Sequence, residues 1–183
     1  TWSLISNSII EGCNCFIQNA NLIKASNYNI GLYVGRLVFR VYFTGLLHMS
    51  IFFVGVLFSV VSLNINNLMA FLGLLILFMN SIWVASFLGL MCSRFRDLEM
   101  IVKNITQMMF FFTPIFWDPS LISSDKSFIV KFNPFYYFLE IIRAPLLGKI
   151  PPIDIYLVTL SITIIGCVLA ILTFRKLKKN LAF

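Results

Sequence analysis

Four apolar runs, each close to the length of a membrane crossing, constrain this chain more than any other feature of its sequence. They cover residues 37–62, 68–92, 100–117 and 153–174. A helix needs about 20 apolar residues to cross a hydrocarbon layer of roughly 30 Å, whereas a barrel strand needs only about ten. These runs are too long for barrel strands. We therefore predict an all-α integral membrane protein, a helical bundle of about four full spans plus part of another.

Composition supports a membrane location. Of the 183 residues, 60% are hydrophobic and only 11% are charged, which leaves too little polar surface to cover a water-soluble globule. The net charge of +7 could indicate a nucleic-acid partner. However, the basic residues stand at the ends of apolar runs and do not form one patch, so we predict membrane topology and no nucleic acid.

The cysteines do not have the spacing of metal ligands. Cys13 and Cys15 are separated by one residue, and Cys92 and Cys167 stand alone among apolar residues. Free cysteines of this kind are small and easily buried. We predict structural thiols and no metal site.

The segments between the apolar runs are of three kinds. Residues 1–12 are interpreted as a partial span or its cytoplasmic end, followed by a polar connector over residues 11–35. The asparagine-rich residues 64–67 predict a short turn. Residues 118–150 are too polar for a simple span, yet part of this segment has an apolar face at helical spacing, which favours short helices at the membrane surface.

Basic residues predict the orientation, because cytoplasmic loops carry an excess of lysine and arginine. An odd number of predicted crossings separates each of three basic groups from the 64–67 turn and from residues 118–150, so all three groups fall on one side, predicted to be the cytoplasm. The groups are Lys24, Arg36 and Arg40; Arg94, Arg96 and Lys103; and Arg175, Lys176, Lys178 and Lys179. On the other side, Lys126, Lys131, Arg143 and Lys149 are offset by Asp118, Asp125, Glu140 and Asp154.

The stretch "SRFRDLEMIVK" at residues 93–103 concentrates charge between two predicted spans. Arg94 and Arg96 could act only as topological anchors. Alternatively, Asp97 and Glu99 could pair with these arginines and fix the geometry of a cytoplasmic turn, so that the two flanking helices move as a unit.

The third span combines amides with aromatic rings. Asn104 and Gln107 are three residues apart and share a helix face, and inside a membrane they require a partner helix or a wet cavity. A sugar ring packs its C–H face on aromatic planes while its hydroxyls bond to amides and water. We therefore interpret this face as a saccharide channel, the alternative being lipid-facing rings and an interfacial belt. The candidate channel residues are Asn104, Gln107, Phe110, Phe111, Phe116 and Trp117.

Residues 118–150 are predicted to form an external gate. Asn133 and Pro134 start a helix, Tyr136 and Tyr137 place amphipathic rings at the interface, and Glu140 and Arg143 are one turn apart, where they could pair with each other or across a dimer axis. His48 lies in the first full span. Without a nearby carboxylate in the span, it favours a hydrogen bond between helices over a proton relay.

Four stretches, in this order, carry a resemblance to a known family: "TWSLISNSIIEG", "NANLIK", "SRFRDLEMIVKNITQMMFFFTPIFW" and "FNPFYYFLEIIRAPLLG". The sequence resembles the membrane-spanning permease subunit of type-two ABC exporters, among them the polysaccharide exporters for O-antigen, capsule or teichoic acid. The resemblance implies a single six-helix permease domain in a bacterial inner membrane. Residues 1–183 would hold helices three to six and the end of the second helix, and an N-terminal interfacial helix and first span would be missing.

The resemblance also implies partners. In that family the connector is a cytoplasmic coupling helix that rests on an ATP-hydrolysing subunit, and the matching positions here are Asn19, Asn21, Leu22 and Lys24. ATP and Mg²⁺ would be bound by that separate subunit, since this chain has no GxxxxGK[ST] motif. A second permease copy would complete the path for a lipid-linked polysaccharide. One departure is "ASNYNIGLYVGR", which lacks the basic residue and proline turn often found there.

Two other functions stay open at this point. The first is an exporter of a drug or lipid with the same type of permease. The second is a membrane-embedded glycosyltransferase or phosphoglycosyl transferase with Asp97 and Glu99 as metal ligands. That enzyme would need further carboxylates or histidines on cytoplasmic loops, and apart from Glu11 the chain has almost none.

Overall fold

A computed structural model describes residues 1–25, 30–58, 65–117 and 130–177. In chain order, the described elements are α1 (Trp2–Gln18), α2 (Ala20–Ala25), α3 (Gly31–Leu57), the short 3₁₀ helix η1 (Ile65–Leu68), α4 (Met69–Arg94), α5 (Asp97–Phe112), α7 (Pro134–Leu146) and α8 (Ile153–Leu177). Every element in these ranges is helical, so the predicted all-α class is confirmed.

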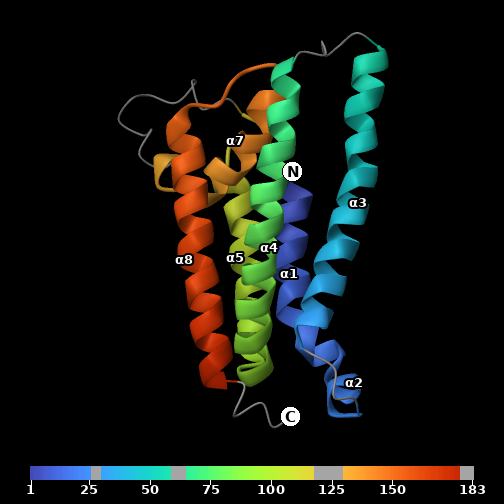
Figure 1. The fold of residues 1–183 in the computed structure, drawn as a ribbon, viewed down its shortest axis with the longest axis vertical. Helices are drawn as coiled ribbons and strands as arrows, with labels where there is room; N and C mark the ends of the chain where they lie inside the picture. Colours follow the sequence, from blue (N-terminus) through green and yellow to red (C-terminus); the bar gives the residue numbers. More distant parts are fainter. Residues whose placement is uncertain (26–29, 59–64, 118–129, 178–183) are drawn as a thin grey trace.

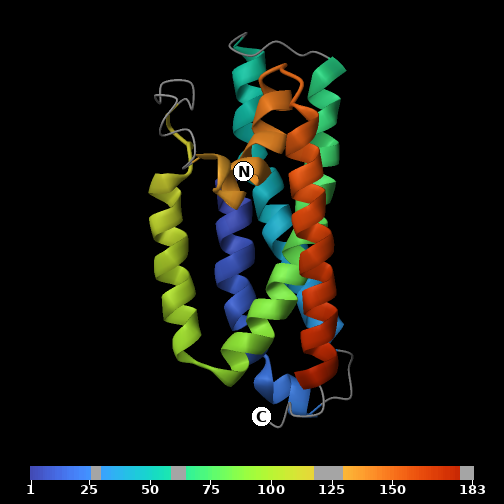
Figure 2. The ribbon, with the colours of Figure 1, turned by 90° about the vertical axis from the view of Figure 1, so that its left-hand side faces the viewer.

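The long helices form an elongated bundle around α4 (Figure 1). α4 packs against α1, α3, α7 and α8, whereas α5 packs mainly against α1. Figure 2 shows α5 at the edge of the bundle, beside α1 and apart from α8. The short helix α7 lies across one end. The bundle is therefore open on both sides of α5.

Three helical segments in the described ranges are long and apolar enough to cross a membrane: residues 31–56, 65–94 and 153–176. The third predicted span is shorter than expected, because α5 has 16 residues and rises only about 24 Å. The helix ends at Thr113, whose ψ of 134° is extended, because the following Pro114 disfavours a helical conformation in the residue before it. Residues 113–117 thus do not continue the span.

The predicted polar connector over residues 11–35 is wrong at both of its ends. α1 continues through Glu11 to Gln18, and α3 already begins at Gly31. The asparagines, serines and glutamate of this region indicate a loop when only their composition is considered. Their spacing of three and four residues is that of one face of a helix.

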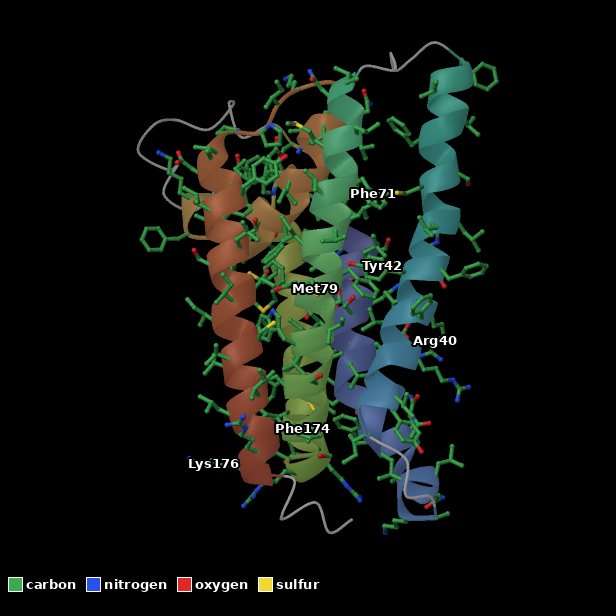
Figure 3. The ribbon with its side chains drawn as sticks, viewed as in Figure 1. Arg40, Tyr42, Phe71, Met79, Phe174 and Lys176 are labelled. Atoms are coloured by element: carbon green, nitrogen blue, oxygen red, sulfur yellow. The ribbon has the colours of Figure 1, made fainter. Side chains whose placement is uncertain are left out.

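The basic groups share one end of the bundle, as predicted. α2, the α4–α5 turn and the last turn of α8 lie at the end where Figure 3 labels Lys176, while η1 and α7 lie at the opposite end. We call the first of these the basic end. Its described cations are Lys24, Arg36, Arg40, Arg94, Arg96, Lys103, Arg175 and Lys176. Lys178, Lys179, Asp118, Asp125 and Lys126 lie outside the described residues.

Small residues bring α1 and α4 into close contact. Residues 81, 85 and 89 of α4 are Ser, Ala and Gly, and all are buried. A Cβ on Gly12 of α1 would lie 2.9 Å from the Cα of Ala85, so the two backbones nearly touch. Membrane helices associate through such small-residue faces, because lipid supplies no hydrophobic driving force between them.

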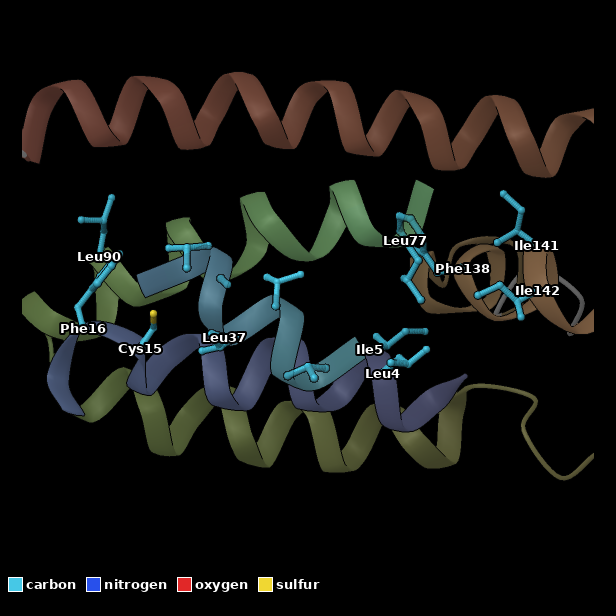
Figure 4. Close-up of a cluster of buried hydrophobic side chains, with 14 of the residues drawn as sticks. Leu4, Ile5, Cys15, Phe16, Leu37, Leu77, Leu90, Phe138, Ile141 and Ile142 are labelled. Carbon is cyan, nitrogen blue, oxygen red and sulfur yellow. The ribbon is translucent and has the colours of Figure 1, made fainter. Parts of the chain in front are cut away.

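Larger side chains complete the core on both sides of this contact. Figure 4 shows Phe16, Leu37 and Leu90 near one end of the cluster, and Leu77 with Phe138, Ile141 and Ile142 of α7 near the other. Several of these side chains, including Phe16, Ile141 and Ile142, are fully buried. The core therefore fixes α1, α3, α4 and α7 against one another, but not α5.

Candidate functional site

α1 carries a polar stripe on the side that faces away from α4. The stripe consists of Ser3, Asn7, Glu11, Asn14 and Gln18, which are half-buried or exposed and recur every three or four residues. The opposite side is buried and includes Ser8, Gly12 and Phe16. α1 is thus amphipathic although it lies within a bundle of membrane-spanning helices.

α3 lies along one flank of this stripe. Arg36, Arg40, Thr44 and His48 recur every four residues on α3, and all are exposed. Nη2 of Arg40 donates to Oε2 of Glu11 at 2.6 Å, forming an ion pair between α3 and α1. The pair lies in the half of the bundle nearer the basic end (Figure 3).

α5 lies along the other flank. Nδ2 of Asn14 donates to Oε1 of Glu99 at 2.7 Å, which joins α1 to the first turn of α5. Farther along, a shallow hollow of about 280 Å³ separates the two helices and is lined by Ser6 of α1 and by Lys103 and Gln107 of α5, among others. The polar groups of α5 thus face those of α1.

These three helices form one surface, because α1 joins both neighbours through adjacent positions. Glu11 and Asn14 are three residues apart and therefore lie about 60° apart around α1. Arg40 and Glu99 accordingly approach the same stripe from its two sides. We call this surface the polar face; its members are Ser3, Ser6, Asn7, Glu11, Asn14, Arg40, Thr44, Glu99, Lys103 and Gln107.

Aromatic rings close the polar face at the end remote from the basic end. The ring of Phe110 lies 5.7 Å from that of Trp2 and 5.5 Å from that of Phe116, both in edge-to-face contacts. The same three residues line a hollow of about 520 Å³ that reaches Arg143 of α7. Trp2 and Phe110 also line the smaller α1–α5 hollow, so the two spaces adjoin at these rings. We call the larger one the aromatic hollow.

Most of the sequence, from α2 to the end of α7, matches a known family. The family model of the ABC-2 type transporter matches residues 19–147, which is more than half of the chain. The chain belongs to the ABC-2 type transporter family. It is thus a multi-pass membrane protein and the permease component of an ABC exporter, a class that works with an ABC ATPase. Comparison with curated proteins gives no significant match.

The predicted channel residues of this ABC-2 permease lie on α5 and just beyond its end, and only some of them line the hollows. Gln107, Phe110 and Phe116 line the hollows described above. Asn104 and Phe111 are exposed beside them, Phe111 with its ring 5.4 Å from that of Phe110. Trp117 is half-buried beyond the end of α5 and lines neither hollow.

The predicted ion pairs of the α4–α5 turn are wrong in the described residues. Glu99 points along α5 toward α1 and accepts from Asn14, while the guanidinium of Arg94 lies 5.8 Å from the ring centre of Phe95. Arg96 and Asp97 are exposed. Asp97 and Glu99 occupy the first helical turn of α5, where the helix dipole already favours acidic groups without an arginine partner.

The predicted gate residues hold α7 against the end of α5. The side chain of Asn133 accepts from the backbone N–H of Phe135 at 3.0 Å, and its amide donates to Oγ1 of Thr113 at 3.0 Å. Arg143 donates to the main-chain oxygen of Pro114 at 2.8 Å. The rings of Tyr136 and Tyr137 lie 5.3 Å apart, and both, like Glu140, are half-buried.

At its other end, α7 is fastened to η1. Nδ2 of Asn67 donates to the oxygen of Leu146 at 3.2 Å, and Nδ2 of Asn66 donates to that of Gly148 at 3.1 Å. Gly148 has a φ of +76°, the left-handed conformation that ends a helix and that glycine adopts without a steric penalty. The predicted turn is therefore a capping element for α7.

The predicted coupling residues belong to α2 at the basic end. Asn19 ends α1. Its side-chain amide donates to the main-chain oxygen of Cys15 at 2.7 Å, and its main-chain oxygen accepts from the backbone N–H of Ile23 at 2.9 Å. Asn21, Leu22 and Lys24 are exposed on α2. Their contact with an ATPase subunit stays a prediction.

Sequence reasoning missed the α1 stripe and the flank of α3. The signal for α1 was present in the periodicity of residues 3–18. His48 was expected to bond another helix, but it is exposed on α3 and makes no such bond in the described ranges. Its four-residue spacing from Thr44 and Arg40 was the available signal.

Proposed function

We propose that this ABC-2 permease is the membrane-spanning subunit of an ATP-driven exporter that moves a lipid-linked polysaccharide, such as O-antigen or capsule, across the bacterial inner membrane. The observation that supports the proposal is the polar face, which adjoins the aromatic hollow at Trp2 and Phe110. The chain itself has no part in ATP chemistry. ATP and Mg²⁺ are held by the partner ATPase.

The chemistry of this surface suits a glycan. Hydroxyl and amide groups of Ser6, Asn7 and Gln107 both donate and accept hydrogen bonds, as sugar hydroxyls require. The edge-to-face arrangement of Trp2, Phe110 and Phe116 leaves ring surface open to the hollow, against which the C–H face of a sugar can pack. Neither set of groups requires a particular sugar. A path for a long polymer needs this lack of specificity, because every sugar of the chain has to pass through it.

The exposure of the polar face supports a second copy of the chain as a partner. The side chain of Arg40 is 64% exposed and that of Glu11 is 37% exposed, although both lie on helices of the bundle. Charged and amide groups that face hydrocarbon are costly and in membrane proteins turn toward a bundle interior or water. Two copies that face each other across a two-fold axis would enclose a path between two polar faces.

The contacts next to α2 support a route for coupling to the ATPase. α2 joins the ends of α1 and α3 that are nearest the basic end. The Glu11–Arg40 pair then ties α3 to α1, and Asn14–Glu99 ties α1 to α5. A displacement of α2 by a closing ATPase would thus move all three helices of the polar face together, as in rigid-body switching.

The test replaces polar groups of the polar face by an apolar residue of similar size. We expect Asn7→Leu and Gln107→Leu, alone or together, to lower glycan export at least about tenfold, since ~1.4 kcal/mol of lost interaction in the path corresponds to one decade. Cell-surface glycan is measured by immunoblotting and lectin binding. Ser161→Leu is the matched control, because Ser161 is exposed on α8 outside the polar face.

Co-purification of the ATPase separates the possible outcomes. The Leu variants should retain the ATPase, while Asn21→Asp with Lys24→Glu in α2 should lose it. Normal export by the double Leu variant would contradict the proposed path. Export of a hydrophobic drug or a free lipid, with no glycan export by the wild type, would assign the permease to that other substrate class.

A further inference from the structure

A second hollow lies on the other side of α5 and is not part of the polar face. It has a volume of about 320 Å³ and is lined by residues of α1, α4, α5, α7 and α8. Figure 2 shows α5 apart from α8. Val84 and Leu88 of α4, Ile105 of α5, Phe138 of α7 and Ile162 of α8 are among its lining residues. We call it the α5–α8 hollow.

Among the few polar groups that line this hollow, all but the amide nitrogen of Asn80 are already bonded to protein in the described residues. Trp83 donates to Oδ1 of Asn80 at 2.7 Å, Ser8 donates to Oγ of Ser81 at 3.0 Å, and Thr106 donates to the oxygen of Val102 at 2.8 Å. A polar ligand would therefore lose its own hydrogen bonds on entering and gain few in return. The lining therefore favours a hydrocarbon group over a polar group as the ligand of this hollow.

The position of the hollow along the length of the bundle indicates which kind of molecule supplies the hydrocarbon. From Leu88, α4 rises about 9 Å to Arg94, and from Ile162, α8 rises about 20 Å to Arg175. Half of a hydrocarbon layer measures roughly 15 Å. An amphiphile with its chain in the hollow would therefore place its headgroup among cations that are exposed at the basic end: Arg94, Arg96, Arg175 and Lys176.

The volume is suitable for one chain. A cavity of about 150 Å³ lined by apolar side chains accepts benzene, so 320 Å³ admits a hydrocarbon of about a dozen carbons. A space open to the bilayer and left empty would forfeit dispersion contacts along its whole lining. Charge complementarity then favours an anionic headgroup over a zwitterionic one.

We propose that the α5–α8 hollow binds one acyl chain of an anionic bilayer phospholipid, whose phosphate contacts the arginines and lysines of the basic end. The bound chain fills the space between α5 and α8, which do not pack against each other. It thereby supports α5, the helix of the polar face with the fewest protein contacts. The proposal requires only that the helices span a bilayer, and it does not depend on the exported substrate.

The test uses Trp83, which lines the hollow. The chain has three tryptophans, so Trp2→Phe with Trp117→Phe leaves Trp83 as its single tryptophan, which is excited selectively at the red edge of the absorption band. The emission of a sample in which Trp83 is also replaced by Phe is subtracted, which removes the contribution of the ATPase. The single-tryptophan variant, in complex with its ATPase, is reconstituted in phosphatidylcholine vesicles that contain increasing fractions of phosphatidylglycerol brominated in mid-chain. Brominated phosphatidylcholine is titrated in parallel. We expect half-maximal quenching of Trp83 at a mole fraction of anionic lipid at least about threefold lower than that of the zwitterionic lipid.

Matched variants locate the binding. Ile162→Phe narrows the hollow and should abolish the preference for the anionic lipid, whereas Ile164→Phe, which changes an exposed residue of the same helix, should leave it intact. Arg94→Gln with Lys176→Gln should raise the half-maximal fraction toward that of the zwitterionic lipid. Size-exclusion elution with the ATPase checks that each variant is folded.

Three results would overturn the proposal. The first is equal quenching by the two lipids. The second is a preference for anionic lipid that persists in Ile162→Phe. The third is relief of the quenching by a prenyl-diphosphate glycan at a small fraction of the lipid concentration, because the hollow would then belong to the cargo.

Discussion

Asn133 shows how much a single side chain decides at the residue scale. Its oxygen caps α7 by accepting from Phe135, and its amide donates to Thr113 at the end of α5. It is 7% exposed, so water cannot replace these bonds. The Asn-Pro pair predicts the helix start from sequence alone, whereas the bond to Thr113, 20 residues away along the chain, depends on how α5 and α7 meet.

We expect Asn133→Ala to lower the free energy of unfolding by about 2 kcal/mol, of which roughly 1 comes from the lost cap and roughly 1 from the lost buried hydrogen bond. Asn133→Ser keeps a capping oxygen but not the reach to Thr113, so its loss should be about half as large. Thermal unfolding in detergent, followed by circular dichroism, measures both. Equal stability of the Ala variant and the wild type would refute the double role.

The observed ion pair differs from the ion pairs that the sequence predicts. The pairs expected within the α4–α5 turn do not form, while Glu11 and Arg40, which sequence reasoning treated separately, lie 2.6 Å apart. Neighbours along a chain are visible in a sequence. Partners on different helices depend on how each helix is rotated about its axis, which is set by core packing far from the charges.

At the element scale, the spacing of small residues determines which helices meet closely. Gly12 and Gly89 bring α1 to α4, and a Cβ on Gly89 would lie 3.0 Å from the oxygen of Gly12. Gly35 of α3, in contrast, has no atom within 4 Å of the position of an added Cβ. The two kinds of glycine are indistinguishable from composition.

We expect Gly12→Ala to destabilise the bundle by about 1–3 kcal/mol, because its methyl group would force α1 away from the backbone of Ala85. Gly35→Ala is the matched control. It should be neutral or stabilising by up to about 1 kcal/mol, since alanine favours the helix and meets no neighbour. Guanidinium or heat unfolding of both variants in the same detergent tests the pair, and a Gly12→Ala variant as stable as Gly35→Ala would contradict the close packing.

The ends of helices are predicted more closely where the sequence changes sharply from apolar to charged residues. The last helix is predicted to end near residue 174 and runs to Leu177, because Arg175 and Lys176 suit the negative end of the helix dipole and extend the last turn. α1 was predicted to end at residue 12 and runs to Gln18. Polar residues at helical spacing form a helix as readily as apolar ones when one side packs against a partner.

At the scale of the whole molecule, the distribution of cations predicts how the bundle lies in the membrane. Lys24, Arg94 and Lys176 are all at the basic end, and Lys149 follows α7 at the other. The end with more lysines and arginines should face the cytoplasm. This orientation also places α2 where an ATP-hydrolysing subunit could reach it.

We expect Lys24→Cys and Lys176→Cys to react with a membrane-impermeant maleimide only after the cells are permeabilised, and Lys149→Cys to react in intact cells. All three lysines are exposed. The native cysteines give the background, because Cys13, Cys15 and Cys92 are buried and Cys167 is half-buried. Labelling of Lys24→Cys in intact cells would reverse the orientation and remove the proposed site of coupling.

The sequence by itself determined the helical class, the membrane location and the sharing of one end by the basic groups, because these follow from run length, composition and local charge. The tertiary structure alone decided that α5 stands at the edge, that α1 carries half of the polar face, and that a separate hydrocarbon-lined hollow lies beside α8. Small residues on α1 and α4 allow those helices to approach most closely. Only that approach fixes which faces of α1, α3 and α5 remain uncovered.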